Sequence, residues 1–236
     1  MASLGIVDTD LEPLITGAND SETWTLNNVI SFTGDVADNI PGDGIIGDAA
    51  GNASLRAAIM ETNANVGEDI IQLAPGNYVL SIGGRFEDGA RTGDLDITDN
   101  LTIRGTGSSA LDTVIDAADL DRVFHVFPGV RLTLENLTVQ GGEAYDGAGI
   151  FIAGTDIPNL ISTGGRVELT DVNIINNEAY NQGGGIYNLG SVNAERSSIS
   201  MNVAGSRGGG IFNHAAVDLV NTTISTNTAV SRGGYL

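Results

Sequence analysis

A block of about 25 residues repeats in the second half of the chain, and this repeat constrains the fold more than any other feature. Gly183–Asn188 reads Gly-Gly-Gly-Ile-Tyr-Asn and returns as Gly-Gly-Gly-Ile-Phe-Asn at Gly208–Asn213, 25 positions later. Three sets of residues keep the same spacing: Ile174, Ile199 and Ile224; Asn177, Asn202 and Asn227; Ala179, Ala204 and Ala229. Repeats of this length indicate a solenoid, in which each unit contacts only its neighbours.

The apolar residues inside each unit alternate with a period of two, which is typical of strands and not of helices. Two successive units show this alternation at Leu132, Leu134, Leu137 and Val139, and at Val167, Leu169, Val172 and Ile174. Short strands separated by Gly, Asn and Asp favour a parallel β-helix. We therefore predict an all-β solenoid of this type, with its clearest coils over residues 130–236.

Equivalent residues on successive coils should stack at the strand spacing of about 4.8 Å. Ile174, Ile199 and Ile224 would then form an internal aliphatic column. Asn177, Asn202 and Asn227 would form a structural ladder in a turn, with side-chain amides bonding to the coils above and below. Glycine triplets at the corners would supply positive φ angles.

The first half of the chain repeats less clearly. We expect residues 1–50 to form an extended or β-rich N-terminal segment and residues 51–236 to form the β-helix. Leu55, Ala58 and Ile59 follow an N-cap serine at helical spacing, which predicts a short amphipathic helix over about residues 54–64 that caps the open end of the solenoid.

At the other end, Leu236 falls on the repeat position of Ile186 and Ile211. A coil that starts there would have no polar capping segment. We therefore expect the chain to be a fragment of a longer protein, with cover by a partner subunit as the alternative.

Composition narrows the range of partners. The 236 residues carry 30 acidic and 10 basic side chains, all arginine, for a formal net charge of −20. This balance repels phosphate backbones and anionic headgroups, so we expect no nucleic acid partner. No apolar run is long enough to span a bilayer, which argues against membrane insertion by this segment. The absence of cysteine excludes disulfides and thiolate metal sites.

The densest acidic clusters suggest a cation site. Asp94, Asp96, Asp99 and Asn100 offer oxygen ligands of the kind that calcium prefers. Asp94 and Asp96 flank the inward Leu95 and are expected on one outer face of a strand. The alternative is a set of turn-forming aspartates on a solubilising acidic face. Calcium is the cofactor that the sequence suggests, if the protein has one.

Two tyrosines are candidate ligand-binding residues. Tyr145 and Tyr180 occupy equivalent places, in Glu-Ala-Tyr, on adjacent coils. Exposed tyrosines at such positions would form a platform for a sugar, since amphipathic aromatic rings are common at recognition surfaces. The alternative is a stabilising stack within a turn.

Catalytic signatures are weak. Hydrolysis of a glycosidic bond requires two carboxylates about 5–9.5 Å apart. The chain has no Asp-Asp pair and no lysine, and neither histidine lies between glycines. Asp94, Asp96, Asp116 and Arg122 are the best candidates if the chain is a polysaccharide lyase or hydrolase; we assign no catalytic residue from sequence alone.

A resemblance sharpens these expectations. Asn52–Ile59 resembles the Cys-Ser-Leu-Arg-Glu-Ala-Ile motif near the N-terminus of a group of bacterial exported β-helix proteins, and the Gly-Gly-Gly-Ile-Tyr-Asn repeats are similar to those of polymorphic outer-membrane proteins. Ala53 and Ala57 depart from the motif by replacing cysteine and glutamate. Without the glutamate, Ser54 lacks the partner of a capping box.

The resemblance covers residues from about 50 onward and implies a right-handed β-helix, in line with the general preference for right-handed crossovers. It also implies an extracellular or cell-surface location. From the regular repeat and the missing catalytic signatures, we expect the chain to act as a non-enzymatic adhesin, passenger or structural module with a glycan or cell-surface ligand. An enzyme of the lyase or hydrolase type is one alternative. Self-assembly by end-to-end stacking of coils is the other.

Overall fold

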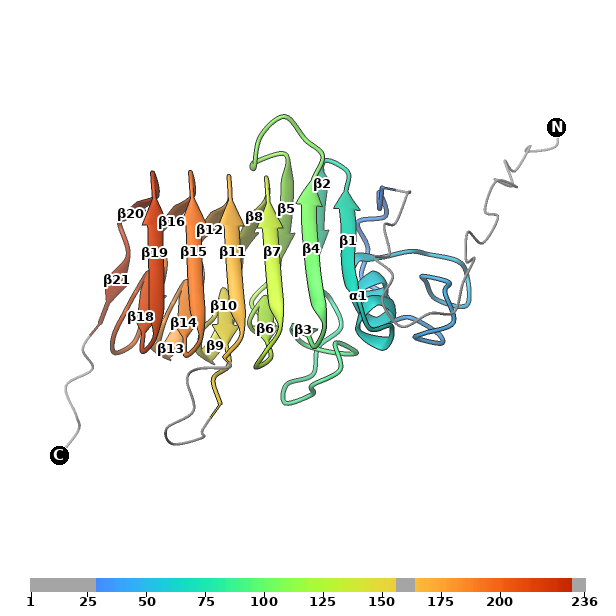
Figure 1. Cartoon of the computed structure of the whole chain (residues 1–236), viewed down its shortest axis with the longest axis horizontal. Helices are drawn as coiled ribbons and strands as arrows, with labels where there is room; N and C mark the ends of the chain where they lie inside the picture. Colours follow the sequence, from blue (N-terminus) through green and yellow to red (C-terminus); the bar gives the residue numbers. More distant parts are fainter. Residues whose placement is uncertain (1–28, 156–163, 231–236) are drawn as a thin grey trace.

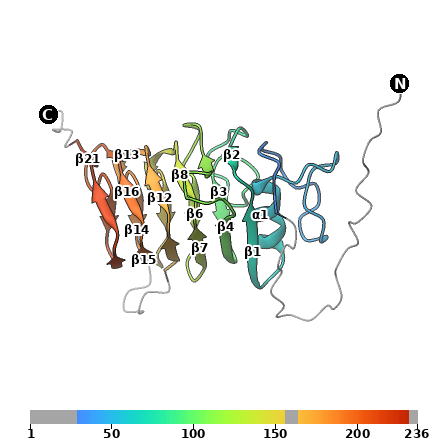
Figure 2. The same ribbon diagram turned by 90° about the horizontal axis from the view of Figure 1, so that it is seen from above.

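The chain folds into a stack of short parallel strands with one helix at its N-terminal end (Figure 1). This computed structural model describes residues 29–155 and 164–230. The strands lie side by side along the long axis of the molecule, and the view from above shows the same succession (Figure 2). The arrangement is compatible with a β-helix.

The strands belong to four parallel sheets, and neighbours in each sheet come from successive coils. The first sheet contains β1 (Glu68–Leu73), β4 (Asn100–Gly105), β7 (Arg131–Glu135), β11 (Arg166–Thr170), β15 (Ser191–Glu195) and β19 (Ala216–Val220). The second contains β2 (Gly76–Val79), β5 (Thr113–Asp116), β8 (Thr138–Gln140), β12 (Asn173–Ile175), β16 (Ser198–Ser200) and β20 (Thr223–Ser225). The third contains β3 (Leu95–Ile97), β6 (Phe124–Val126), β10 (Ile150–Ile152), β14 (Ile186–Asn188) and β18 (Ile211–Asn213). The fourth contains β9 (Glu143–Asp146), β13 (Glu178–Gln182), β17 (Val203–Ala204) and β21 (Thr228–Ala229).

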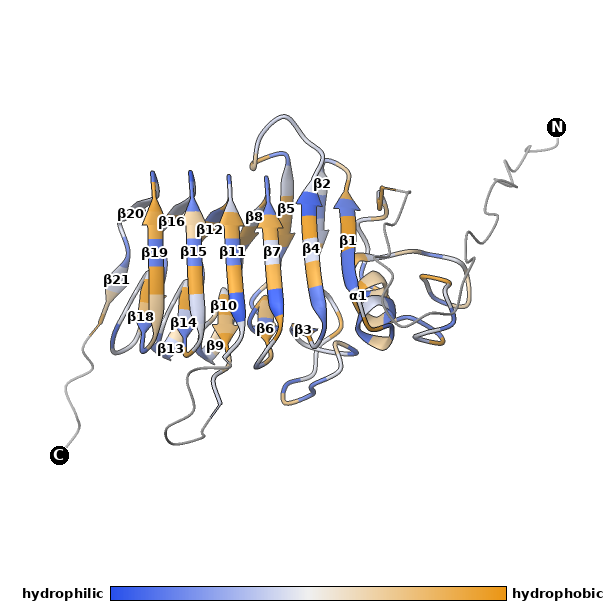
Figure 3. Cartoon of the chain, viewed as in Figure 1, coloured by the Kyte–Doolittle hydropathy of each residue, from blue (hydrophilic) through white to orange (hydrophobic). Residues whose placement is uncertain are grey.

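The apolar core lies between the sheets and is built from aligned columns. Ile174 pairs with Ile199, and Ile199 pairs with Ile224, across β12, β16 and β20. Ile174 and Ile199 are fully buried, whereas Ile224 is 46% exposed. Figure 3 shows the corresponding alternation of hydrophobic and hydrophilic residues along the strands of the first sheet. The hydrophobic residues of the sequence thus alternate with the period of two that is expected for strands, and not with a helical period.

Two asparagine ladders cross the coils. Asn177 Nδ2 donates to Asn202 Oδ1 at 2.9 Å, and Asn202 Nδ2 donates to Asn227 Oδ1 at 3.0 Å. A second ladder joins Asn188 Nδ2 to Asn213 Oδ1 at 2.7 Å. Each amide both donates and accepts, so it satisfies polar groups that burial would otherwise leave unpaired.

The glycines at the corners of the coils have two structural roles. Gly183 and Gly208, the first of each triplet, have φ angles of 68° and 64°, which favour glycine. The second glycine allows close approach between coils: a β-carbon on Gly184 would lie 2.3 Å from the Val203 carbonyl oxygen and 2.5 Å from that of Gly209. Positive φ therefore explains only part of the triplet.

The single helix in the described residues, α1 (Leu55–Ala64), begins where the sequence predicts it. The Ser54 Oγ accepts a hydrogen bond from the Ala57 backbone N–H at 3.1 Å, which is the N-cap interaction. Leu55 and Ile59 are buried in the main core, and α1 packs against β1 and β3. The helix thus lies at the end of the stack where β1 begins the first sheet (Figure 1).

The N-terminal segment has little regular structure in its described part. Between Val29 and Ser54 the backbone is mostly irregular, with short turns and bends, and Ile30 makes an isolated parallel bridge to Leu73. The remainder of the expected N-terminal segment, residues 1–28, lies outside the described residues, as does Leu236.

Candidate functional site

A buried arginine of α1 organises the part of the chain that forms the site. The Arg56 side chain is fully buried, and its Nε lies 2.7 Å from Oδ1 of Asp35. Its other nitrogens donate to the backbone oxygens of Ala90 at 2.9 Å, Gly93 at 2.8 Å and Asp94 at 3.3 Å. A planar guanidinium can serve several acceptors at once, which explains how one side chain fixes this segment.

The segment between β2 and β3 forms a loop over residues 80–94, which we call the site loop. The Glu87 carboxylate closes its tip by accepting from the backbone N–H groups of Arg91 at 2.7 Å and Thr92 at 3.0 Å. At its end, Gly93 has a φ of 63°, and a β-carbon there would lie 2.1 Å from the Gly84 carbonyl oxygen. Glycine is therefore required where the loop returns to the stack.

Residues of the site loop and the next two coils line an open pocket of about 160 Å³, which we call the acidic pocket. From the site loop it is lined by Arg85, Phe86, Glu87, Asp88 and Asp94. From the following coils it is lined by Asp121, Arg122, His125, Ala144 and Tyr145. Four carboxylates thus face two guanidinium groups and one imidazole.

Asp94 lies deep in this pocket. Burial raises the pKa of its carboxyl group to about 8; the neighbouring Asp96 raises it further, Arg122 opposes the shift, and Asp121 adds to it. The Arg122 Nε lies 3.1 Å from Asp94 Oδ2, but it is not aligned for a hydrogen bond. Asp121 Oδ1 accepts instead from the Arg122 backbone N–H at 2.8 Å.

Asp96 lies below the pocket and is fully buried. Its Oδ2 accepts from the Ala90 backbone N–H at 2.9 Å, and its Oδ1 lies 3.2 Å from Nδ1 of His125. Asp88, Asp96 and His125 bring ligand atoms within 4.8 Å of one another, and no other group of three such side chains is found in residues 29–155 and 164–230. Asp94, at the end of the site loop, and Asp96, which this loop covers, are therefore both buried, and the expectation of a solvated acidic face is wrong for both.

His125 begins a column of aromatic rings on the third sheet. It pairs in register with Phe151, which pairs with Tyr187, which pairs with Phe212. The Phe151 and Tyr187 rings are stacked with centroids 5.0 Å apart, and Tyr187 and Phe212 are stacked at 5.1 Å. Because these rings cover one another's faces, the column stabilises the stack of coils more than it offers free ring surface.

Free aromatic surface lies instead at the rim of the acidic pocket. Tyr145 is 68% exposed and Phe86 is fully exposed. Tyr180, on the next coil, donates from its hydroxyl to Glu143. Among the described residues, the ring contacts do not include one between Tyr145 and Tyr180, so the two tyrosines do not form a mutual stack.

The four residues that the sequence suggests for calcium lie in two places. Asp94 and Asp96 lie at the acidic pocket, whereas Asp99 accepts from the backbone N–H groups of Gly67 at 2.7 Å and Asn100 at 2.8 Å. The Asn100 Oδ1 accepts from the Arg131 backbone N–H at 2.9 Å.

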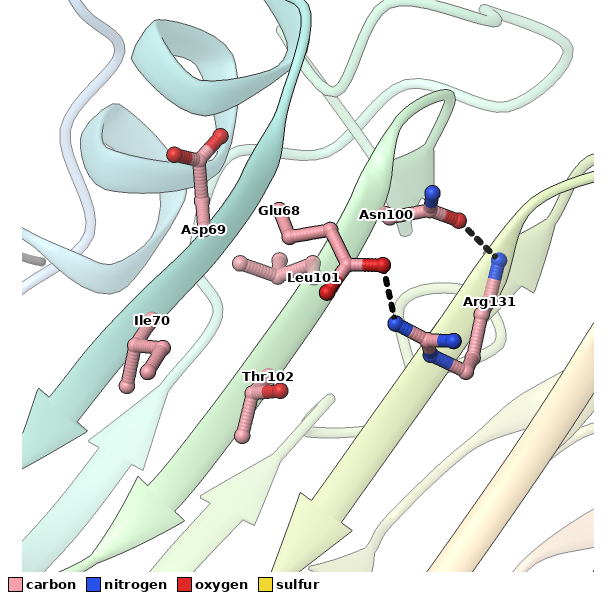
Figure 4. A pocket seen from close by; sticks show the side chains of 7 residues that line it. All are labelled: Glu68, Asp69, Ile70, Asn100, Leu101, Thr102 and Arg131. Carbon is pink, nitrogen blue, oxygen red and sulfur yellow. Dashed lines mark hydrogen bonds and ion pairs between the residues drawn. The ribbon is translucent and has the colours of Figure 1, made fainter. Parts of the chain in front are cut away.

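Asn100 and Arg131 line a second, smaller pocket of about 70 Å³ on the first sheet (Figure 4). There the Arg131 Nη2 donates to Glu68 Oε1 at 2.6 Å, so the charged groups are paired across the strands. This pocket has no free aromatic ring.

Asp116, the remaining candidate, serves a turn. Its Oδ1 accepts from the Ala118 backbone N–H and its Oδ2 from Gln140 Nε2, both at 2.9 Å. It does not line the acidic pocket. The structure thus brings together Asp94, Arg122 and Tyr145 from the sequence candidates, with Asp96 beneath them.

Sequence reasoning missed Arg56, Asp88 and His125. A signal existed for His125, because it occupies the same position in its coil as Phe151, Tyr187 and Phe212 do in the following coils. No repeat marks Asp88, since it lies in a loop that the other coils lack.

Comparison of the chain with protein-family models, with curated proteins and with solved structures finds no match. In the described part of the chain, no helix has the length and apolar character needed to cross a membrane.

Proposed function

We propose that the chain is a non-enzymatic module of a secreted or cell-surface β-helix protein, and that it binds a glycan at the acidic pocket. The observation that carries this proposal is the combination of two exposed rings, Phe86 and Tyr145, with carboxylate and guanidinium groups in one cavity. Sugars present an apolar ring face and hydroxyl groups, which fit aromatic surfaces and polar side chains respectively.

The proposed architecture is a right-handed parallel β-helix capped by α1, as in the bacterial exported proteins that the Asn52–Ile59 motif resembles. Its handedness rests on that resemblance and on the general preference for right-handed crossovers. The capping role is supported by the position of α1 beside β1 and by its buried Leu55 and Ile59. Within the motif, Ser54 caps the helix and Arg56 holds the site loop, which gives both residues a physical role.

The test is a glycan array probed with the folded chain, followed by calorimetric titration of the glycans that bind. Phe86→Ala and Tyr145→Ala should each weaken binding about tenfold, equivalent to about 1.4 kcal/mol. Phe32→Ala is the matched control, because Phe32 is 38% exposed and does not line the pocket. Failure to bind neutral and uronate-containing glycans at millimolar concentration would overturn the proposal.

A polysaccharide lyase or hydrolase is the second candidate. It is favoured by the position of Asp94, Asp121 and Arg122 in the same cavity, because glycoside cleavage uses paired carboxylates. Incubation with the glycans that bind, followed by assays for reducing ends and unsaturated products, separates the two functions. Product formation that Asp94→Asn and Asp121→Asn abolish would replace the binding proposal with an enzymatic one.

Self-assembly is the third candidate and rests on a different surface. Leu219, Val220 and Ile224, on β19 and β20, are 37%, 48% and 46% exposed. Light scattering during size-exclusion chromatography tests it: a mass that rises with concentration supports association, and a constant mass near 24.3 kDa rejects it.

A further inference from the structure

We propose that Asp88, Asp96 and His125 form a binding site for a first-row divalent metal ion of the zinc class. This site goes beyond glycan recognition and stands independently of it. The three side chains come from separate parts of the sequence: Asp88 from the site loop, Asp96 from β3 and His125 from β6. Their ligand atoms meet within 4.8 Å.

The separation of Asp96 and His125 is the first argument. Oδ1 of Asp96 and Nδ1 of His125 lie 3.2 Å apart. A charge-assisted hydrogen bond between such groups is typically about 2.7–2.9 Å long. Two ligands that share a tetrahedral zinc ion, each about 2.0–2.1 Å from it, lie about 3.3 Å from each other. The observed separation is thus an ordinary hydrogen-bonding distance, and it is also close to that of two ligands on a shared ion.

Preorganisation is the second argument. The Ala90 backbone N–H fixes Asp96 Oδ2 at 2.9 Å, which leaves Oδ1 directed at the imidazole. The His125 ring is held between Phe127, with centroids 4.3 Å apart, and Phe151 at 5.3 Å. Second contacts of this kind orient metal ligands and restrict their motion. Two of the three proposed ligands are therefore already in place.

Asp88 supplies the third ligand. Its side chain is exposed and makes no hydrogen bond or ion pair with any residue in the described parts of the chain. Its carboxylate is thus available, and closing it onto an ion costs no existing contact. The remaining coordination positions would face the acidic pocket, where water or a sugar hydroxyl can reach them.

The ligand chemistry selects the ion. Two carboxylates and one imidazole suit zinc and its neighbours, whereas calcium takes six to eight oxygen ligands. The proposal therefore differs from a calcium site at Asp94, Asp96, Asp99 and Asn100 in both the ion and the ligands. Because the chain has no cysteine and two histidines, few other positions compete for such an ion.

The experiment is calorimetric titration of the full chain with zinc chloride in the absence of glycan. The chain carries no histidine tag, because a tag would bind the metal. Micromolar binding with a stoichiometry of one is expected. His125→Ala should weaken it at least a hundredfold and Asp88→Asn at least tenfold. His214→Ala is the matched control, since His214 also contacts a ring of the aromatic column, Phe212, but belongs to no group of three possible metal ligands in the described residues; it should leave binding unchanged.

Two further readouts keep the test decisive. Cobalt substitution should give visible absorption bands that His125→Ala removes, and circular dichroism of the exposed-loop variant Asp88→Asn should match that of the unchanged chain. Calcium should compete poorly. Absence of zinc binding by the unchanged chain, or equal loss in His125→Ala and His214→Ala, would overturn the proposal. Neither result bears on glycan binding in a metal-free buffer, so the two proposals fail separately.

Discussion

The later coils, from Arg131 to Ala229, and the first coils, from Glu68 to Val126, are held together by different interactions. The later coils keep a spacing of 25 residues between β11, β15 and β19, and neutral amide ladders and aliphatic columns join them. The first coils carry a long loop between β2 and β3 and bury the charged Asp96, and Arg56 of the neighbouring α1 is buried against that loop. The difference teaches that the candidate site lies where the repeat is broken. A strict repeat gives every residue a fixed neighbour on the next coil. An inserted loop such as the site loop has no such neighbour, so it can fold over the sheet and form a pocket.

The largest expected effect comes from the buried charge of Arg56, which joins α1 to the loop of the first coils. Arg56→Met leaves Asp35 buried without its cation and leaves the carbonyls of Ala90 and Gly93 unsatisfied. We expect the free energy of unfolding to fall by about 3–5 kcal/mol, measured by denaturant titration. Arg104→Met is the control: Arg104 pairs with Glu135 at the surface, so the loss should stay below about 1 kcal/mol. Equal losses in the two variants would show that the first coils do not depend on the buried ion pair.

The later coils should respond most to a change in backbone spacing. In Gly184→Ala, the new methyl group meets two carbonyl oxygens of the next coil, those of Val203 and Gly209, and the Gly209 oxygen is held by the Gly185 backbone N–H at 3.1 Å. We expect a loss of about 3 kcal/mol, at the upper end for overpacking. Gly83→Ala is the matched change in the site loop. A β-carbon there meets nothing within 4 Å, so thermal unfolding should shift little. A similar loss at both positions would contradict the proposed difference between the two regions.

The asparagine ladder offers a finer test within the later coils. Asn202→Ala removes the acceptor for the Asn177 backbone N–H and the donor to the Ile174 carbonyl oxygen, both of them buried. We expect a loss of about 2 kcal/mol in denaturant unfolding, since a buried polar group left unpaired costs about 1–3 kcal/mol. Asn227→Ala, at a half-buried position on the last described rung, should cost less. If the Asn227 variant loses as much as the Asn202 variant, burial does not set the strength of the ladder.

The same contrast explains which parts of the molecule could be predicted from sequence. The positions of Ile174, Ile199 and Ile224 follow from periodicity alone, because each coil imposes its register on the next. The helix follows from local chemistry, since Ser54 and the apolar spacing act over a few residues. The pocket depends on Asp88, Asp121 and Tyr145, and Asp88 reaches the other two only through the path of the site loop. Secondary-structure propensity and hydrophobic periodicity carry no information on the path of this loop. The burial of Asp94 and Asp96 could therefore not be predicted from the sequence.

The effect most specific to the site, and the smallest when measured over a single pH unit, is a dependence of stability on pH. Because burial raises the pKa of Asp94 to about 8 from a usual value of 3.8, the folded protein keeps a proton that the unfolded chain releases. The stabilisation from this group is fully present below pH 3.8 and is lost as the pH rises through about 8. Between pH 6 and 7 the free energy of unfolding should fall by about 1.4 kcal/mol per pH unit, measured in chelator to exclude metal ions.

Asp94→Asn should remove this slope, because the amide does not ionise. Asp171 provides a control of opposite sign in the later coils: the hydrogen bond from Arg196 lowers the pKa of its exposed carboxyl group. Its contribution is present above the usual pKa and is lost as the pH falls, so Asp171→Asn should leave the slope between pH 6 and 7 unchanged. If Asp94→Asn keeps the slope, another group of the acidic pocket holds the proton. If neither variant nor the unchanged chain shows a slope, the site loop admits enough water to ionise Asp94, and the first coils are then less tightly closed than the later ones.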